Sequence, residues 1–260
     1  MTRALFAGLA ALSLVMLTGF PGIASGQQPV IVFPPLEGAD VEIDGSWTTA
    51  GEWSKASETI VNYTDGSRLA IRGMNDGDFL YVMLEMPDDY LLDGHGAVCF
   101  DTEAEGGTYL AQDDYCFVMG TALREYHGTN RTTLMQQVPL DQYVTAQRAM
   151  SDSKSPLYSS KEHVSYEFRV PLSYLGDDRT HYGFYVTFDT TGQDNNYTYY
   201  YSWPDYKTAE YLRTVPPRSW GIVSLSEDTV IPEFPVPVIG ALAAVVGGVA
   251  LMSRTRLFRL

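Results

Sequence analysis

Three stretches of the chain place apolar residues at every second position, and this period limits the fold more than any other feature. The stretches are 80–86, 164–170 and 184–188, and the positions between hold mostly polar, charged or tyrosine residues. A period of two is that of a β-strand with one face in a core and the other outward. Turn signals such as Asp-Gly and Gly-Gly separate the stretches, and no helical period before residue 231 lasts beyond a turn or two. The sequence therefore predicts an all-β domain, an antiparallel β-sandwich of half-buried strands.

The N-terminal segment differs from this middle part. Residues 1–26 carry Arg3, then an apolar run, then the small residues 24–26. This order is the pattern of a secretory signal peptide, and a retained N-terminal anchor is the alternative. Residues 27–230 are therefore predicted to form one extracellular domain.

The C-terminal segment 231–260 is apolar as well. Its proline-rich start leads into an apolar run over 236–252, and basic residues follow only on the far side, at Arg254, Arg256 and Arg259. Such a run is typical of a short transmembrane helix, and the arginines place that end in the cytoplasm. A buried core helix is the alternative. The sequence thus predicts a stalk, one membrane helix and a basic cytoplasmic end.

Charge and cysteine content narrow the setting further. The formal net charge is −15, and such a field repels nucleic acid, so no nucleic-acid partner is expected. Only two cysteines occur, Cys99 and Cys116, on two predicted neighbouring strands of the exported part. Disulfides persist outside the cell, and the prediction is a structural disulfide between them. Two free buried thiols or metal ligands are the alternatives.

No catalytic constellation is identifiable. The four histidines are scattered without metal-ligand spacing, and neither a Ser-His-Asp order nor a phosphate-binding glycine loop occurs. Glu167 and Arg169 lie on one face of a predicted strand and are interpreted as a structural charge pair, with a ligand contact as the alternative. The chain is therefore not expected to be an enzyme.

The most suggestive binding feature is an aromatic stretch. In a strand, its alternate residues share one face, and these are Tyr197, Tyr199, Tyr201 and Trp203. Flat rings stack on the apolar faces of sugars, while phenol and indole groups hydrogen-bond to hydroxyls. The four residues are candidate saccharide ligands, and the alternative is that they are core packing.

Acidic residues gather around the two cysteine strands. Calcium prefers oxygen ligands of this kind, and the candidate metal ligands are Asp88, Asp89, Asp101, Asp113 and Asp114. The spacing fits no EF-hand, so a solvated acidic loop is the alternative, and no cofactor is expected to be required. Sequons predict glycosylated surface positions at Asn62, Asn130 and Asn196.

Several motifs in order resemble the family 9 carbohydrate-binding modules and their DOMON-like relatives. They span roughly residues 41–225 and read Val41-Glu-Ile-Asp44-Gly45, Glu52-Trp53, Asn75-Asp-Gly-Asp-Phe-Leu-Tyr-Val82, Asp88-Asp89, Phe100-Asp101-Thr102, Tyr166-Glu-Phe-Arg-Val-Pro-Leu172, Gly183-Phe184 and Trp220-Gly221.

The resemblance implies a DOMON-like or jelly-roll-like sandwich, with Trp53 and Trp220 as scaffold. It also implies glycan binding, although the family's sugar binders clamp the sugar between two tryptophans and only Trp203 matches one of them. Some relatives carry structural calcium. Others bind haem for electron transfer, for which the candidate ligands here are Met83, Met86, Met119 and His95.

The tail resembles the archaeal PEF-CTERM sorting signal. Pro232, Glu233 and Phe234 precede the apolar run and the basic end, as in that signal. The resemblance implies an archaeosortase-like enzyme as a partner, whereas an ordinary membrane anchor is the alternative. The expected function is that of a non-catalytic, cell-surface-anchored module that binds glycans or contacts the envelope. A haem-binding electron-transfer domain and a purely structural envelope or adhesion protein are the alternatives.

Overall fold

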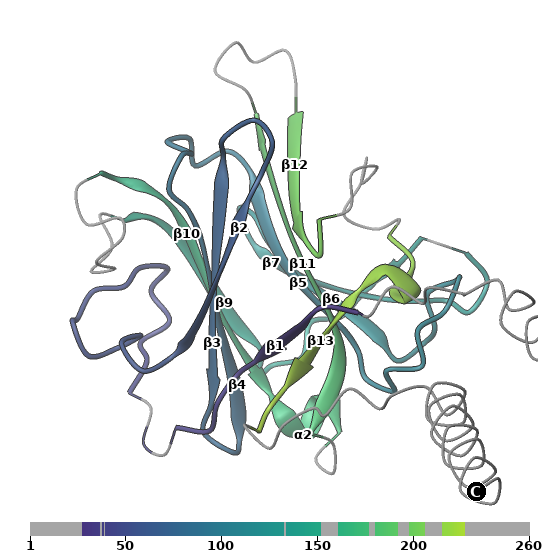
Figure 1. Cartoon of the computed structure of the whole chain (residues 1–260). Helices are drawn as coiled ribbons and strands as arrows, with labels where there is room; N and C mark the ends of the chain where they lie inside the picture. The colour runs from purple at the N-terminus through teal and green to yellow at the C-terminus, as the bar shows by residue number, and fades with distance from the viewer. Residues whose placement is uncertain are drawn as a thin grey trace, which may run out of the picture.

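The protein folds into two β-sheets that face one another (Figure 1). The computed structural model describes residues 28–36, 38, 40–132, 134–151, 161–176, 180–191, 198–205 and 215–226. In this part of the chain, helix is limited to the single turn α2 (Leu172–Leu175) and a 3-10 turn over Pro217–Ser219. The predicted all-β sandwich is thereby confirmed.

The larger sheet has eight strands. Along its main path they run in the order β1 (Val30–Val32), β13 (Gly221–Ser224), β11 (His181–Thr191), β5 (His95–Asp101), β6 (Asp114–Met119), β7 (Leu123–His127) and β8 (Gln136–Val138). The eighth strand, β12 (Thr198–Trp203), pairs with the second half of β11, while β13 pairs with its first half. The neighbours are antiparallel apart from β1 and β13, which are parallel.

The smaller sheet has five strands, all antiparallel to their neighbours. Their order is β2 (Ser57–Asn62), β3 (Arg68–Asn75), β4 (Phe79–Met86), β10 (His163–Pro171) and β9 (Thr145–Ser151). The three stretches with a period of two correspond to β4, β10 and β11. Their apolar residues, including Leu80, Val170 and Phe184, fill the core between the sheets.

The outer faces of β4, β10 and β11 are also largely buried, which corrects the expectation that these strands are half-buried. Trp47 and Trp53, from the segment before β2, pack on Met74, Tyr81 and Met83 of the five-stranded sheet. The opposite faces of β4 and β10 are therefore buried too. The burial was not visible in the strands themselves, because the covering residues lie elsewhere in the sequence.

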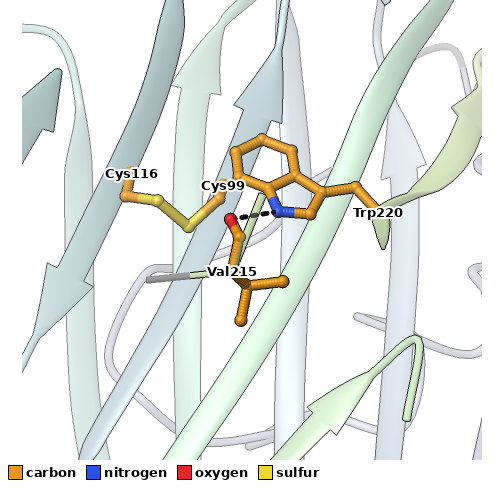
Figure 2. Close-up of a disulfide and its surroundings, with 4 residues drawn as sticks. All are labelled: Cys99, Cys116, Val215 and Trp220. Carbon is orange, nitrogen blue, oxygen red and sulfur yellow. Dashed lines mark hydrogen bonds between the residues drawn. A yellow bond between two sulfur atoms is a disulfide. The ribbon is translucent and has the colours of Figure 1, made fainter. Parts of the chain in front are cut away.

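The predicted disulfide joins the outer faces of two neighbouring strands. Cys99 of β5 and Cys116 of β6 stand directly opposite one another and are bonded. Figure 2 shows the indole of Trp220 beside them, with its Nε1 donating to the Val215 carbonyl at 3.2 Å. Tyr185 stacks on the same indole with the rings 17° from parallel. The disulfide thus belongs to a second apolar cluster outside the main core.

The predicted signal peptide (1–26) and the tail (231–260) lie outside the described residues, so their assignments stay predictions. Among the residues that are described, no helix has the length and apolar character that a membrane crossing requires.

Candidate functional site

Strand β12 carries the predicted aromatic face. Tyr201 is 8% exposed and Trp203 is 7% exposed, and both belong to the core between the sheets. Tyr199, two residues earlier on the same face, is 45% exposed, and Tyr197 lies outside the described residues. Core packing, the alternative interpretation, therefore holds for two of the four residues, and Tyr199 remains a candidate ligand.

The neighbours of Tyr201 and Trp203 explain their burial. The ring of Trp203 lies 5.9 Å from that of Phe184, and the ring of Tyr201 lies 4.9 Å from that of Tyr63. The Tyr201 hydroxyl donates to Asp65 at 3.0 Å. Burial raises the pKa of Tyr201 to about 12, so its hydroxyl stays a donor at neutral pH.

A pocket of about 510 Å³ lies near α2. Figure 1 shows α2 at the end of the sandwich opposite to the β11–β12 end. Its walls come from the β3–β4 turn, the segment before β9, the start of α2 and the start of β11, and include Asp78, Phe79, Tyr143, Leu172, Ser173 and Tyr182. Pockets that bind small molecules commonly have this size and this mixture of rings and a few polar groups.

The local structure fixes the walls of this pocket. Asp76 accepts from the backbone N–H of Phe79 at 2.7 Å and from the Tyr81 hydroxyl at 2.8 Å, which holds the turn. The Leu172 N–H donates to the Asp78 carbonyl at 2.8 Å and ties α2 to that turn. The Phe79 ring carries the Arg169 guanidinium 4.4 Å from its centroid.

Tyr143 presents the most exposed large ring of the described residues, at 59%. Asp78 and Ser173 line the same pocket. Sequence reasoning missed it because Tyr143 stands in a short turn without a period. Asp78 and Phe79 entered the sequence analysis only as part of the Asn75–Val82 motif of the family resemblance.

The five predicted metal ligands do not form one site. Asp88 and Asp89 lie before the start of β5, whereas Asp101 is its last residue. Asp88 pairs with Arg68 at 3.2 Å on the surface. Asp89 accepts from the Leu91 N–H at 3.0 Å, and burial raises the pKa of Asp89. A strand length therefore separates these two residues from the other three.

Asp101, Asp113 and Asp114 do come together, and Glu105 joins them. One carboxylate oxygen from each of Asp101, Glu105 and Asp113 lies within 4.8 Å of the others. Asp114 stands directly opposite Asp101 in the β5–β6 ladder. Burial and the neighbouring Asp101 raise the pKa of Asp114 to about 8, and burial and a hydrogen bond with Asp101 raise the pKa of Glu105 to about 7.

Glu167 and Arg169 do not pair with one another, which corrects that expectation. The Glu167 carboxylate accepts from the backbone N–H groups of Asp44 and Gly45, at 3.0 and 2.9 Å, and from Trp53 Nε1 at 2.8 Å. Arg169 instead lies over Phe79. Gly45 has a φ of 90°, and a Cβ there would meet the Arg148 backbone at 2.5 Å, so only glycine fits this turn. The Asp-Gly and Glu-Trp motifs are therefore scaffold.

The candidate haem ligands lie in different places. Met83 packs under Trp47 and Trp53 outside the five-stranded sheet, while Met86 and Met119 lie in the main core. His95 is near the surface and contacts Asp189 at 3.0 Å.

Two of the three sequons can be placed. Asn62 of β2 and Asn130 are exposed, whereas Asn196 lies outside the described residues. Glycosylation at these positions stays a prediction.

All four tryptophans of the chain are buried. Trp47, Trp53, Trp203 and Trp220 are between 1% and 7% exposed. A sugar held between two tryptophans, as the family resemblance implies, therefore has no exposed indole to contact here. The accessible aromatic rings near the candidate surfaces are those of tyrosines.

Comparison with known proteins supports the fold. No protein-family model and no curated protein match the sequence. The chain is similar to a family 9 carbohydrate-binding module from Caldicellulosiruptor kristjanssonii in complex with cellotriose, at 15% identity and a TM-score of 0.53, over 80% of this chain and 100% of that one. A module of that family from the same organism in complex with glucose matches at 15% identity and a TM-score of 0.52, over 78% and 100%. The protein thus has a fold similar to that of these carbohydrate-binding modules.

Proposed function

We propose that the chain is a non-catalytic glycan-binding module displayed at the outer surface of a cell. The observation that carries this proposal is the likeness of nearly the whole described domain to two modules solved with cellotriose and with glucose. A pocket of suitable size at one end of the sandwich adds a place for a sugar.

The pocket near α2 is the site that we assign to the sugar. The exposed ring of Tyr143 offers a flat apolar face, and Asp78 and Ser173, which line the same pocket, offer a carboxylate and a hydroxyl for sugar hydroxyls. Tyr199 of β12 is the second surface, because it is the predicted ring that remains exposed and described. It pairs with Thr190, near the end of β11 opposite the pocket residue Tyr182. The two surfaces therefore belong to opposite ends of the sandwich.

The module is held at the surface through segment 231–260 in this proposal. The apolar run there serves as the membrane helix, and Pro232, Glu233 and Phe234 serve as the recognition element for an archaeosortase-like enzyme. A single stacked ring contributes about 1 kcal/mol, so display of many copies at a surface would supply the affinity that one site lacks.

The test measures binding of cellotriose and glucose, followed by a glycan array, to the full-length chain in a detergent without a sugar headgroup. We expect weak binding that Tyr143→Ala reduces roughly fivefold, which corresponds to about 1 kcal/mol. Tyr109→Ala is the matched control, because Tyr109 is 56% exposed and outside both surfaces. Chromatography of the sugar afterwards should recover it intact.

The other variants and outcomes separate the two surfaces. Loss of binding in Tyr199→Ala with wild-type binding in Tyr143→Ala would move the site to β12. Equal loss in Tyr109→Ala would show that the effect is not local to either surface. No binding to any glycan would overturn the proposed function.

A further inference from the structure

A buried carboxylate lies next to the proposed sugar pocket. Glu125 of β7 is 0% exposed, and it stands opposite Phe117 of β6 on the core side of the eight-stranded sheet. Within the described part of the chain, the pocket lining does not include Glu125. Any effect of this carboxylate on a bound sugar must therefore act through residues that do line the pocket.

Three donors satisfy the Glu125 carboxylate. Its Oε1 accepts from the Tyr174 hydroxyl and lies 2.6 Å from His127 Nε2, and its Oε2 accepts from the Asp141 N–H at 2.8 Å. Burial by itself raises the pKa of Glu125, but these hydrogen bonds outweigh burial and lower it. The group is therefore ionised at neutral pH, and because a carboxylate only accepts, His127 Nε2 carries the hydrogen. Hydrogen bonds to an ionised acceptor are the stronger kind, so the three partners are held tightly.

One of these partners belongs to α2, a wall of the pocket. The helix is a single turn without a side-chain cap, and a turn of this length is not stable through its own hydrogen bonds. Its Ser173 is exposed and lines the pocket, while the next residue, Tyr174, donates to Glu125. The hydrogen bond to Glu125 therefore helps to fix how α2 presents Ser173 to the pocket.

A second partner belongs to the turn that carries Tyr143. The chain crosses from β8 to β9 here, and the Asp141 carboxylate accepts from the Tyr143 N–H at 2.8 Å. The Asp141 carbonyl accepts from the Val144 N–H at 3.3 Å, and Val144 is 3% exposed in the core. The exposed Tyr143 ring is thus held on one side by the core and on the other by the contact between Asp141 and Glu125.

We propose that Glu125 is a positioning residue of the sugar pocket, because one buried carboxylate fixes the Tyr143 turn and α2 relative to each other. The role in sugar binding rests on the proposed function, whereas the contacts with Asp141 and Tyr174 do not. A ring that is already ordered loses less freedom when a ligand stacks on it, so fixing Tyr143 strengthens binding without a direct contact from Glu125.

The first experiment needs no sugar. Hydrogen–deuterium exchange with overlapping peptides follows the Asp141 amide in the full-length chain in the same detergent. Glu125→Leu removes the acceptor, so this amide should exchange on the order of tenfold faster or more. An unchanged rate in Glu125→Leu would overturn the positioning role.

Glu125→Gln is the conservative variant that should restore the wild-type rate. Its carbonyl oxygen can accept from the Asp141 N–H, while its amide nitrogen can donate to the Tyr174 oxygen and to His127 Nε2 in the tautomer protonated on Nδ1. Exchange as fast in Glu125→Gln as in Glu125→Leu would show that the amide is not held by an acceptor at this position.

The second experiment measures cellotriose affinity. Glu125→Leu should weaken binding by no more than the roughly fivefold expected for Tyr143→Ala, and Glu125→Gln should bind like the wild type. In the double variant Glu125→Leu/Tyr143→Ala the loss should be clearly smaller than the product of the two single losses, because both changes act on the same ring. Losses that multiply in full would assign Glu125 a general effect on the fold.

Tyr174→Phe keeps the test decisive if Glu125→Leu does not fold. It removes one hydroxyl and leaves the ring 5.3 Å from that of Tyr115, and it should weaken cellotriose binding. Tyr63→Phe is the matched control, because the half-buried Tyr63 donates to the Ser202 carbonyl at 2.8 Å in the β2–β3 turn, a strand length away from the pocket turn. Equal loss in both variants would reduce the effect to lower stability and overturn the inference. A wild type that binds no glycan would overturn the proposed function, and the exchange rates would still decide whether Glu125 holds the Tyr143 turn.

Discussion

At the scale of single residues, two variants of β12 test which of its rings belong to the core and which are free to contact a ligand. Trp203→Ala removes a ring that is 7% exposed and packed on Phe184, so it should lower the free energy of unfolding by about 3–5 kcal/mol. Tyr199→Ala removes a ring that is 45% exposed and should change it by less than about 0.5 kcal/mol. Urea unfolding of both variants checks this, and equal effects would contradict the difference in burial.

The same strand shows what a residue pattern can predict. A period of two correctly assigns Tyr199, Tyr201 and Trp203 to one face, because that follows from strand geometry. The period does not predict how deeply each side chain is buried, because burial depends on where the opposite sheet ends. Tyr143 is the reverse case. The pocket that it lines is assembled from four separate segments, and the turn that contains Tyr143 has no sequence pattern that predicts this position.

At the scale of elements, the β5–β6 hairpin allows a prediction about its disulfide. Cys99 and Cys116 are 17 residues apart, and closing a loop of this length stabilises the native state by about 3 kcal/mol through the unfolded chain. The double variant Cys99→Ala/Cys116→Ala should lose about that amount in urea unfolding. Reductant should then have no further effect on the variant, whereas a variant as stable as the wild type would contradict the argument.

The strands and the disulfide could be predicted from the sequence, whereas the grouping of acidic side chains in space could be predicted only in part. The alternation identifies β4, β10 and β11, and the positions of the two cysteines correctly predict a bond between adjacent strands. The grouping of acidic residues by sequence was wrong for Asp88 and Asp89, because a strand carries the chain from one end of the sandwich to the other. Residues that are close in sequence are also close in space within one hairpin loop, but they lie far apart when a strand separates them.

At the scale of the whole molecule, buried acidic groups determine how stability depends on pH. In the absence of calcium, burial raises the pKa of Asp114 and of Glu167 to about 8, and that of Glu105 to about 7. Each group binds more protons in the folded than in the unfolded state between its ordinary pKa near 4 and the raised value. Their stabilising contribution is complete below about pH 4 and is lost as pH rises through about 8.

Other titratable groups also make the stability depend on pH. Hydrogen bonds to Glu85 and Lys161 outweigh burial and raise the pKa of His163, so its contribution is also lost as pH rises. Hydrogen bonds from His127 and Tyr174 outweigh burial and lower the pKa of Glu125, whose contribution is lost as pH falls below about 4.5. The net charge of −15 adds repulsion that protonation relieves. Maximum stability is therefore expected at mildly acidic pH.

The corresponding prediction is that the Tm measured in EDTA falls between pH 5 and pH 8.5. Glu167→Gln is the control, because it removes one ionisable group from β10. The amide nitrogen of glutamine donates, so it cannot replace the carboxylate oxygen that accepts from Trp53 Nε1 or the one that accepts from the backbone, and a lower absolute stability is expected. This variant should show a smaller difference in Tm between the two pH values than the wild type, whatever its absolute stability. A Tm that rises from pH 5 to pH 8.5 in EDTA would mean that the buried carboxylates are already ionised in the folded protein, with their hydrogen bonds outweighing the cost of burial.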